Sequence, residues 1–256
     1  MTGWIYPRVI AHRCGGVLAP ENTLAGLYVA ARMGVRAVEF DVMLSADGVP
    51  VLIHDETLER TTNGQGAVAA HTAAQLGRLD AGVRHHPAFS GEPLPTFQMA
   101  LETCRMLGLA ANIEIKPATG QDRQTGETVA QVVKAFLSEG EKRGGQCVQP
   151  PDLLLSSFSS EALDAAHMAS LPPRIVAPAR ALLVESVPDD WAARLKRLAC
   201  HSLHCSSRLL ELERLGEIRA AGVPVACYTV NHLDEAQRLF KAGVAAVFSD
   251  RIDRVA

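Results

Sequence analysis

The sequence predicts a single α/β domain in which eight parallel strands close into a barrel and helices pack around it. Short apolar runs recur along the chain, each followed by a helical pattern and usually by a Gly or Pro break. There are eight such runs, as a closed (β/α)₈ barrel requires, whereas an open doubly wound sheet usually has fewer. A chain of 256 residues suits one such barrel, so we expect one domain over residues 1–256.

The predicted parallel strands alternate with helices in chain order. They span residues 8–12, 37–42, 111–116, 152–156, 174–177, 202–206, 223–229 and 245–249. A ninth β-like run, 49–54, follows the second strand too closely for a parallel crossover, which takes about a dozen residues or more. The Asp47-Gly48 pair between these two runs favours a tight turn. We therefore expect a hairpin that folds back and returns His54 towards Asp41.

A small insertion is predicted over about residues 55–95, after the second strand and its hairpin. Helical periodicity is weak there, and chain-breaking residues are frequent: Gly64, Gly66, Gly82, Pro87, Gly91, Pro93 and Pro95. Active sites of such barrels lie at the carboxyl ends of the strands, so an insertion at this place can shape substrate entry. The segment from Gly120 to Gly126 is predicted to be another loop.

The composition excludes several kinds of partner. A formal net charge of −3 gives no basic field for a nucleic-acid backbone and no polybasic patch for a membrane. No stretch approaches the roughly 20 apolar residues of a membrane span, and the N-terminal residues lack a secretory pattern. Six cysteines without a C-x-x-C pair predict reduced thiols rather than a zinc framework or a disulfide scaffold. We expect a cytoplasmic protein with a small-molecule partner.

Carboxylates at the ends of two predicted strands indicate a metal site. Glu39 and Asp41 alternate along the second strand, so they share one face, and Glu114 has the same placement on the third. Three acids buried together are costly unless they are protonated or a cation neutralises them. We therefore predict one divalent cation bound by these three residues. Oxygen ligands favour Mg²⁺, with Ca²⁺ or Mn²⁺ as alternatives, and the absence of an H-x-H pair after the first strand argues against zinc.

Basic side chains and imidazoles accompany these acids. Arg13 and Lys116, at the ends of the first and third strands, are suited to hold the phosphate of an anionic ester. His12 and His54 can exchange protons near neutral pH, one as the base for the nucleophile and the other as the acid for the leaving alkoxide. Glu21 is predicted to support these groups from outside the cluster. Each residue alone is commonly structural, so the prediction depends on their joint placement.

Three further residues allow structural readings. Asn22 or Thr23 is expected to cap the helix that follows them. His204 shares one face of a later predicted strand with Ser202 and Ser206, and either a site histidine or a buried structural histidine fits that position.

Short motifs over nearly the whole chain resemble those of the glycerophosphodiester phosphodiesterase family. They are Ala11-His12-Arg13, Ala19-Pro20-Glu21-Asn22-Thr23, Glu39-Phe40-Asp41-Val42, Asp47-Gly48, His54-Asp55, Leu58-Glu59-Arg60-Thr61-Thr62-Asn63-Gly64, Ile113-Glu114-Ile115-Lys116, Ser156-Ser157-Phe158 and Tyr228-Thr229-Val230-Asn231. Within the family the chain looks most like the cytoplasmic bacterial enzyme. The resemblance implies a TIM barrel with a small insertion after the second histidine. It implies hydrolysis of glycerophosphodiesters to sn-glycerol 3-phosphate and an alcohol such as choline, ethanolamine or glycerol. Carried over to this chain, it gives the same metal ligands, histidine pair and phosphate-binding residues.

One position departs from the family pattern. The family usually has Gly directly after His-Arg, where this chain has Cys14 followed by Gly15-Gly16. If the family Gly adopts positive φ, Cys14 should strain the phosphate loop or narrow the site, and its thiol could make the enzyme sensitive to oxidation.

The attacking group and two rival functions stay open. Either water or a hydroxyl of the substrate's glycerol can attack phosphorus, and the second route would pass through a cyclic phosphate. A related phosphodiesterase that cleaves lysophospholipids is the first rival, although the insertion has no long apolar stretch for an acyl chain. A barrel that binds phosphodiesters without cleaving them is the second.

Overall fold

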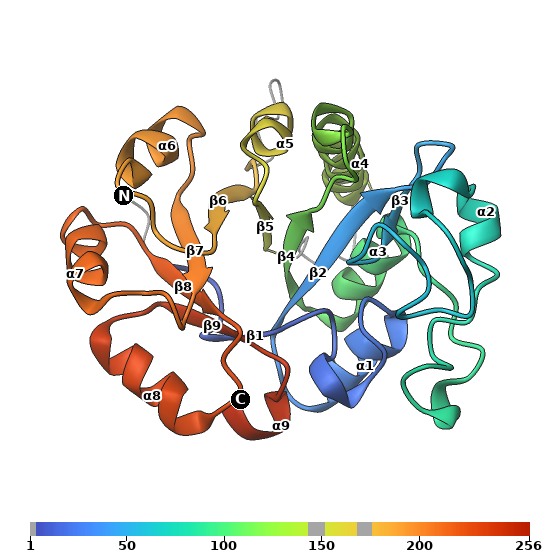
Figure 1. Ribbon diagram of the computed structural model, residues 1–256, viewed down its shortest axis with the longest axis horizontal. Helices are drawn as coiled ribbons and strands as arrows, with labels where there is room; N and C mark the ends of the chain where they lie inside the picture. Colours follow the sequence, from blue (N-terminus) through green and yellow to red (C-terminus); the bar gives the residue numbers. More distant parts are fainter. Residues whose placement is uncertain (1–3, 143–151, 168–175) are drawn as a thin grey trace.

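The computed structural model describes residues 4–142, 152–167 and 176–256. Eight parallel strands form a closed barrel (Figure 1). They are β1 (Val9–Ala11), β2 (Ala37–Leu44), β4 (Ala110–Ile115), β5 (Leu153–Ser157), β6 (Ala179–Val184), β7 (Ser202–Ser206), β8 (Val225–Tyr228) and β9 (Ala246–Ser249). β1 pairs with β9 on one side and with β2 on the other, which closes the barrel and confirms the predicted fold.

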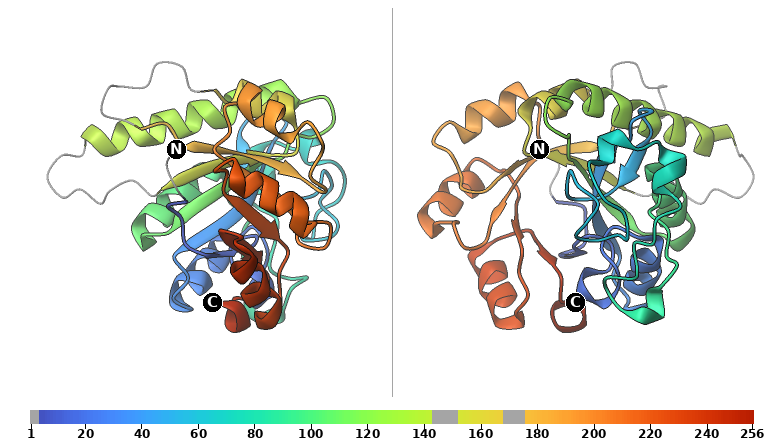
Figure 2. Two further views of the ribbon diagram at one scale, coloured as in Figure 1. Left: turned by 90° about the vertical axis from the view of Figure 1, so that its left-hand side faces the viewer. Right: turned by 45° about the vertical axis from the view of Figure 1, so that its right-hand side comes forward.

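Helices surround the strands on the outside (Figures 1 and 2). They are α1 (Leu24–Arg32), α3 (Phe97–Leu107), α4 (Asp122–Lys142), α5 (Ser160–Ala165), α6 (Trp191–Arg197), α7 (Leu212–Ala220), α8 (Leu233–Ala242) and α9 (Ile252–Val255). Thr23 caps α1 by accepting a hydrogen bond from the amide of Gly26, so of the two candidate caps it is the threonine that serves. Within the described ranges, no helix is both long and apolar enough to cross a membrane.

The second strand continues into the predicted hairpin. β3 (Pro50–Leu52) runs antiparallel to the end of β2, with Val42 opposite Leu52. Gly48 has a φ of 74°, a left-handed conformation that the tight turn requires and that glycine adopts at little cost. The amide of Ile53 then donates to the carbonyl of Asp41, which brings the following residue, His54, next to the end of β2.

The fifth parallel strand, β6, was predicted in the wrong place. Residues 174 and 175 lie outside the described residues, and 176–178 form no strand; β6 begins after Pro178, at Ala179. The predicted segment and β6 are both short apolar runs, so the local sequence pattern does not show which of them forms the strand. Pairing with the neighbouring strands decides it, because Ala181 lies opposite Ser156 of β5 and Ser202 of β7.

The predicted loop at 120–126 is also wrong, because α4 begins at Asp122 and Gly126 lies inside it. A Cβ atom on Gly126 would lie 2.1 Å from the carbonyl oxygen of Ala162 in α5. This glycine therefore marks a close approach of two helices rather than a chain break.

The stretch between β3 and α3 contains η2 (Val68–Ala70), α2 (Ala73–Leu76) and η3 (Pro87–Phe89). Leu58, Val68, Leu76 and Leu94 form a small apolar core there with residues of the β2–β3 hairpin. The stretch lies beside that hairpin, on the right in Figure 1. It thus has its own packing outside the barrel wall, while the division of the chain into one domain with an insertion stays a prediction.

His204 lies inside the barrel and is structural. It is 1% exposed, its ring packs against Phe248 and Trp4, and its Nε2 lies 3.4 Å from the Ser202 hydroxyl. Burial lowers the pKa of His204 from its ordinary 6.5 to about 3, so the folded protein holds this imidazole neutral.

This burial predicts a stability loss in mild acid. Between pH 6.5 and 3 the unfolded chain binds a proton at His204 that the folded chain does not, so stability falls as pH falls through this window. From pH 7 to pH 5 this residue should account for about 2 kcal/mol of the loss in unfolding free energy. In His204→Gln, the unfolding free energy measured with urea should therefore fall by about 2 kcal/mol less between pH 7 and pH 5 than in the unmodified protein. The same pH-dependent loss in His204→Gln and in the unmodified protein would show that His204 is not its source.

Candidate active site

Three carboxylates meet at the carboxyl ends of β2 and β4, as predicted. Asp41 and Glu114 lie opposite each other in the register of these neighbouring strands, and Glu39 lies two residues before Asp41 on the same face. One oxygen of each lies within 4.8 Å of the other two. Glu39 and Asp41 are 3% and 1% exposed. The sheet register alone therefore gathers three acids in one desolvated space.

The electrostatics of this cluster fit a divalent cation. Burial and the charge of Asp41 raise the pKa of Glu39 to about 8 and that of Glu114 to about 7. Burial would raise the pKa of Asp41 too, but Lys116, His54 and Arg13 hold it below its usual value. Glu39 Oε1 is buried and has no hydrogen-bond partner among the described residues. An orphaned carboxylate oxygen beside two further acids is a suitable ligand set for a hard metal ion.

His12 and Asp250 form a pair on one side of the cluster. His12 Nδ1 donates to Asp250 Oδ1 at 2.7 Å, and His12 Nε2 lies 3.9 Å from Glu39 Oε2. Asn231 fixes Asp250 through two hydrogen bonds: its Nδ2 donates to Asp250 Oδ2, and its Oδ1 accepts from the backbone amide of Asp250. Burial alone would lower the pKa of His12, but the bond to Asp250 and the charge of Glu39 raise it. The imidazole is thus oriented with Nε2 towards the carboxylates.

His54 lies on the other side of the cluster. Its Nδ1 donates to Asp55 Oδ1 at 2.7 Å, and its Nε2 accepts from Lys116 Nζ at 2.8 Å. Lys116 Nζ also lies 3.2 Å from Glu114 and 3.6 Å from Asp41. Burial lowers the pKa of His54, and the charge of Asp41 and the bond to Asp55 offset this only in part. The two histidines therefore flank the same acids, each with its own carboxylate partner.

A left-handed turn after β1 explains the departure at Cys14. Arg13 and Cys14 have φ values of 50° and 75°, and their amides donate to the Oε2 and the carbonyl oxygen of Glu39. The predicted positive φ is therefore present. The expected narrowing and oxidation sensitivity are wrong, because the thiol is fully buried in the core beside Gly26. Burial also raises the pKa of Cys14 well above its usual value, which keeps it unreactive.

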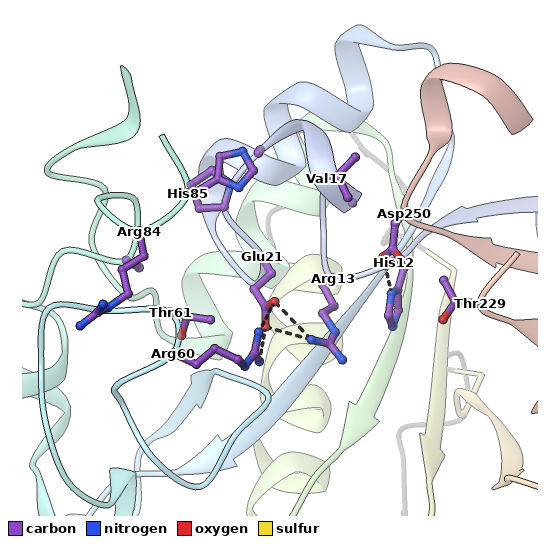
Figure 3. A pocket seen from close by; sticks show the side chains of 14 residues that line it. His12, Arg13, Val17, Glu21, Arg60, Thr61, Arg84, His85, Thr229 and Asp250 are labelled. Atoms are coloured by element: carbon purple, nitrogen blue, oxygen red, sulfur yellow. Dashed lines mark hydrogen bonds and ion pairs between the residues drawn. The ribbon is translucent and has the colours of Figure 1, made fainter. Parts of the chain in front are cut away.

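An arginine of the insertion, Arg60, connects two parts of the site, and Figure 3 shows one of them, where Arg60 and Arg13 both contact Glu21. Arg60 Nη1 and Nη2 donate to Glu21 at 2.7 and 2.8 Å, while its Nε and Nη2 donate to Asp55. Glu21 in turn accepts from Arg13 at 3.1 Å. Asp55 is the partner of His54, so this guanidinium fixes Arg13 and His54 at the same time. Glu21 thus supports the site through hydrogen bonds to two arginines.

A cavity of about 570 Å³ opens beside this network. Its lining includes His12, Arg13 and Asp250 from the barrel, and Arg60, Thr61, Arg84 and His85 from the insertion. The insertion therefore forms one wall of the entrance to the site.

We expect Arg60→Lys to lower the rate of phosphodiester cleavage by roughly ten- to a hundredfold, the usual effect of losing an outer hydrogen-bond partner in a metal site. A lysine ammonium can pair with Glu21 or Asp55 but cannot reproduce the planar fork that binds both. Steady-state rates of the purified variant test this, with Arg123→Lys on exposed α4 as the control. Rates within twofold of the unmodified protein would show that the bridge is dispensable.

Sequence reasoning placed all the predicted site residues together but missed several of their partners. Asp250, Asn231, Asp55 and Arg60 received no role, and Asn22, which had been considered as a cap, instead binds Asp41 through its side-chain amide at 2.8 Å. Closure of the barrel could have indicated Asp250, because β9 pairs with β1 and Ser249 lies opposite Ala11. The remaining partners come from loops, whose path the strand pattern does not determine.

The barrel, the acidic cluster, which could hold a metal ion, and the two imidazoles are the arrangement of a phosphodiester hydrolase. Residues 12–254 match the model of the glycerophosphoryl diester phosphodiesterase family. The chain belongs to this family and is a glycerophosphodiester phosphodiesterase by class.

Named relatives and a solved structure are similar to this chain over nearly its full length. The glycerophosphodiester phosphodiesterase of Caldanaerobacter subterraneus is 32% identical over 94% of this chain and 93% of its own. That of Bacillus subtilis is 29% identical over 95% and 83%. A phosphodiesterase of Oleispira antarctica, solved with its product sn-glycerol 3-phosphate, is 37% identical and superposes with a TM-score of 0.86 over 98% of this chain and 95% of its own.

Proposed function

We propose that this enzyme releases sn-glycerol 3-phosphate from glycerophosphodiesters at the carboxylate cluster, with one divalent cation bound by Glu39, Asp41 and Glu114. The observation that carries the proposal is the meeting of these acids within 4.8 Å, flanked by His12 and His54. The Oleispira relative supports the product. When bound, such a cation polarises a phosphoryl oxygen and offsets the charge that develops during cleavage.

The protein side chains supply orientation and proton transfer. Arg13 and Lys116 hold the phosphate through charge-assisted hydrogen bonds. His12 and His54 move the two protons of the reaction, one from the nucleophile and one to the leaving alcohol. Asp250 and Asp55 keep the imidazoles oriented, because each accepts a hydrogen bond from Nδ1 and so directs Nε2 towards the cluster, where Nε2 of His54 accepts from Lys116 Nζ.

The ion is proposed to be Mg²⁺, because an all-oxygen ligand set of three carboxylates suits a hard cation. Rates of glycerol 3-phosphate release from glycerophosphocholine, measured after chelation and after return of Mg²⁺, Ca²⁺ or Mn²⁺, test this. Highest activity with Mg²⁺ is expected. Full activity in chelator would contradict the metal proposal altogether.

The attacking group can be identified with a modified substrate. If the hydroxyl next to the phosphorylated carbon of glycerol attacks phosphorus, the 2-deoxy analogue of glycerophosphocholine should be cleaved at least about a hundredfold more slowly, because the intramolecular nucleophile is lost. The measurement is the ratio of kcat/KM for the two substrates. Equal kcat/KM values for the two substrates would eliminate the cyclic phosphate and leave water as the nucleophile.

A cytoplasmic location is proposed from the cysteines. Cys14, Cys104, Cys200, Cys205 and Cys227 are all free thiols, whereas Cys147 lies outside the described residues. Free thiols in this number are typical of reducing compartments.

A further inference from the structure

Two aromatic rings reach towards each other across the mouth of the barrel. Phe158 follows the end of β5 and Tyr228 ends β8, so β6 and β7 lie between them in the barrel order. Their ring centroids are nevertheless 6.1 Å apart, with the ring planes at 81°. The hydroxyl of Tyr228 donates to the carbonyl oxygen of Val184, the last residue of β6, at 2.7 Å. The tyrosine ring therefore lies over β7 and is held at both ends.

This aromatic pair borders the catalytic cluster. Ser156, two residues before Phe158, lies opposite Glu114 in the register of β4 and β5. Burial is the largest cause of the raised pKa of Tyr228, and the negative charges of Glu185 and Glu114 contribute to it. Phe158 is 46% exposed, a high value for a phenyl ring at the carboxyl end of a barrel strand. An exposed aromatic ring beside a polar site is available for a ligand rather than for the core.

The two sides of the mouth differ in charge. On one side, Arg13 from the barrel and Arg60 and Arg84 from the insertion line the cavity described above. On the opposite side, the loops after β6 and β7 contain four acids and one arginine: Glu185, Asp189, Asp190, Glu211 and Arg208. Asp189 and Asp190 pair with arginines of α7 and α6. Glu185 is exposed, forms no ion pair with the described residues, and follows directly the residue that accepts the Tyr228 hydroxyl.

We infer that Phe158, Tyr228 and Glu185 form the subsite for the leaving alcohol and that this subsite takes a cationic head group, a trimethylammonium or primary ammonium. The faces of aromatic rings attract cations, and two rings at a steep angle provide two walls of such a site. Glu185 supplies an opposite charge. The phosphate would then lie at the cluster, between the arginines of the insertion and this aromatic, acidic side. The inference rests on the proposed function, because it names the substrate class of that same site.

A pair of substrates of equal shape tests the charge of the head group. One is glycerophosphocholine, and the other is its 3,3-dimethylbutyl analogue, in which carbon replaces the quaternary nitrogen. Release of glycerol 3-phosphate from each, measured with the intact chain and Mg²⁺, gives a ratio of kcat/KM values. We expect the enzyme to prefer glycerophosphocholine by roughly three- to thirtyfold, the range of cation–π interactions.

Substitutions locate the preference. Phe158→Leu should bring the ratio close to one, and Glu185→Gln should lower it about two- to threefold. Tyr28→Leu, on the exposed face of α1, is the control and should keep the ratio of the unmodified enzyme. Because each ratio is internal to one variant, a general loss of activity does not affect it. Equal kcat/KM values in the unmodified enzyme, or a preference that survives in Phe158→Leu, would overturn the subsite. Release from neither substrate would instead overturn the proposed function.

Discussion

Glu39→Gln should lower glycerol 3-phosphate release by about a thousandfold or more, since the loss of a charged ligand removes several kcal/mol of metal-dependent stabilisation. The substitution preserves the shape of the side chain, and the amide oxygen of the glutamine can replace Glu39 Oε2 as acceptor for the backbone amide of Arg13. What changes is the charge beside Asp41 and Glu114. We therefore expect weaker binding of Mg²⁺ as well as slower turnover.

Two measurements on the same preparation separate these effects. Calorimetric titration with Mg²⁺ reports the binding of the ion, and initial rates at saturating Mg²⁺ report turnover. Glu161→Gln, an exposed carboxylate on α5, is the matched control. If Glu39→Gln binds Mg²⁺ and turns over substrate like the control, Glu39 has no part in a metal site.

His12→Gln and His54→Gln should each lower the rate by about a hundred- to ten-thousandfold, the range for loss of a general acid or base. Both variants should still bind Mg²⁺, because neither imidazole is among the three proposed ligands. His201→Gln, an exposed histidine after α6, is the control and should retain full activity.

A p-nitrophenyl ester of glycerol 3-phosphate then distinguishes the two roles. p-Nitrophenolate leaves without a proton, so the variant that lacks the acid should regain most of its rate on this ester, whereas the variant that lacks the base should not. Similar losses on both substrates for both variants would contradict a division of labour between the two imidazoles.

The strand pattern was sufficient to predict that the three acids meet, because the barrel places side chains by simple rules. Alternation along β2 puts Glu39 and Asp41 on one face, and the parallel register with β4 brings Glu114 opposite Asp41. Both facts follow from short segments. His54 was reached in the same way, because the Asp47-Gly48 turn fixes the direction of the hairpin.

What could not be predicted depends on contacts distant in sequence. Asp250 lies 238 residues after His12, and they meet only because the barrel closes. Arg60 belongs to an insertion with little regular structure, so its four hydrogen bonds to Glu21 and Asp55 have no local signal. Strand β6, the fifth parallel strand, was misplaced for a related reason: two apolar runs flank Pro178, and pairing with β5 and β7 selects the second.

Cys14 illustrates the limit of reasoning from residue type. A side chain at a position where the family has glycine indicated a positive φ, and the φ of 75° agrees. A positive φ does not determine in which direction the side chain of Cys14 points. Packing against Gly26 turns the thiol into the core, while the amides of Arg13 and Cys14 donate to Glu39.

The most direct test of the account is anomalous diffraction from crystals of the active enzyme soaked in Mn²⁺. A single peak at roughly 2.0–2.4 Å from oxygens of Glu39, Asp41 and Glu114 is the predicted result. Active crystals with no peak among these three carboxylates, or with the ion bound elsewhere in the mouth of the barrel, would contradict it.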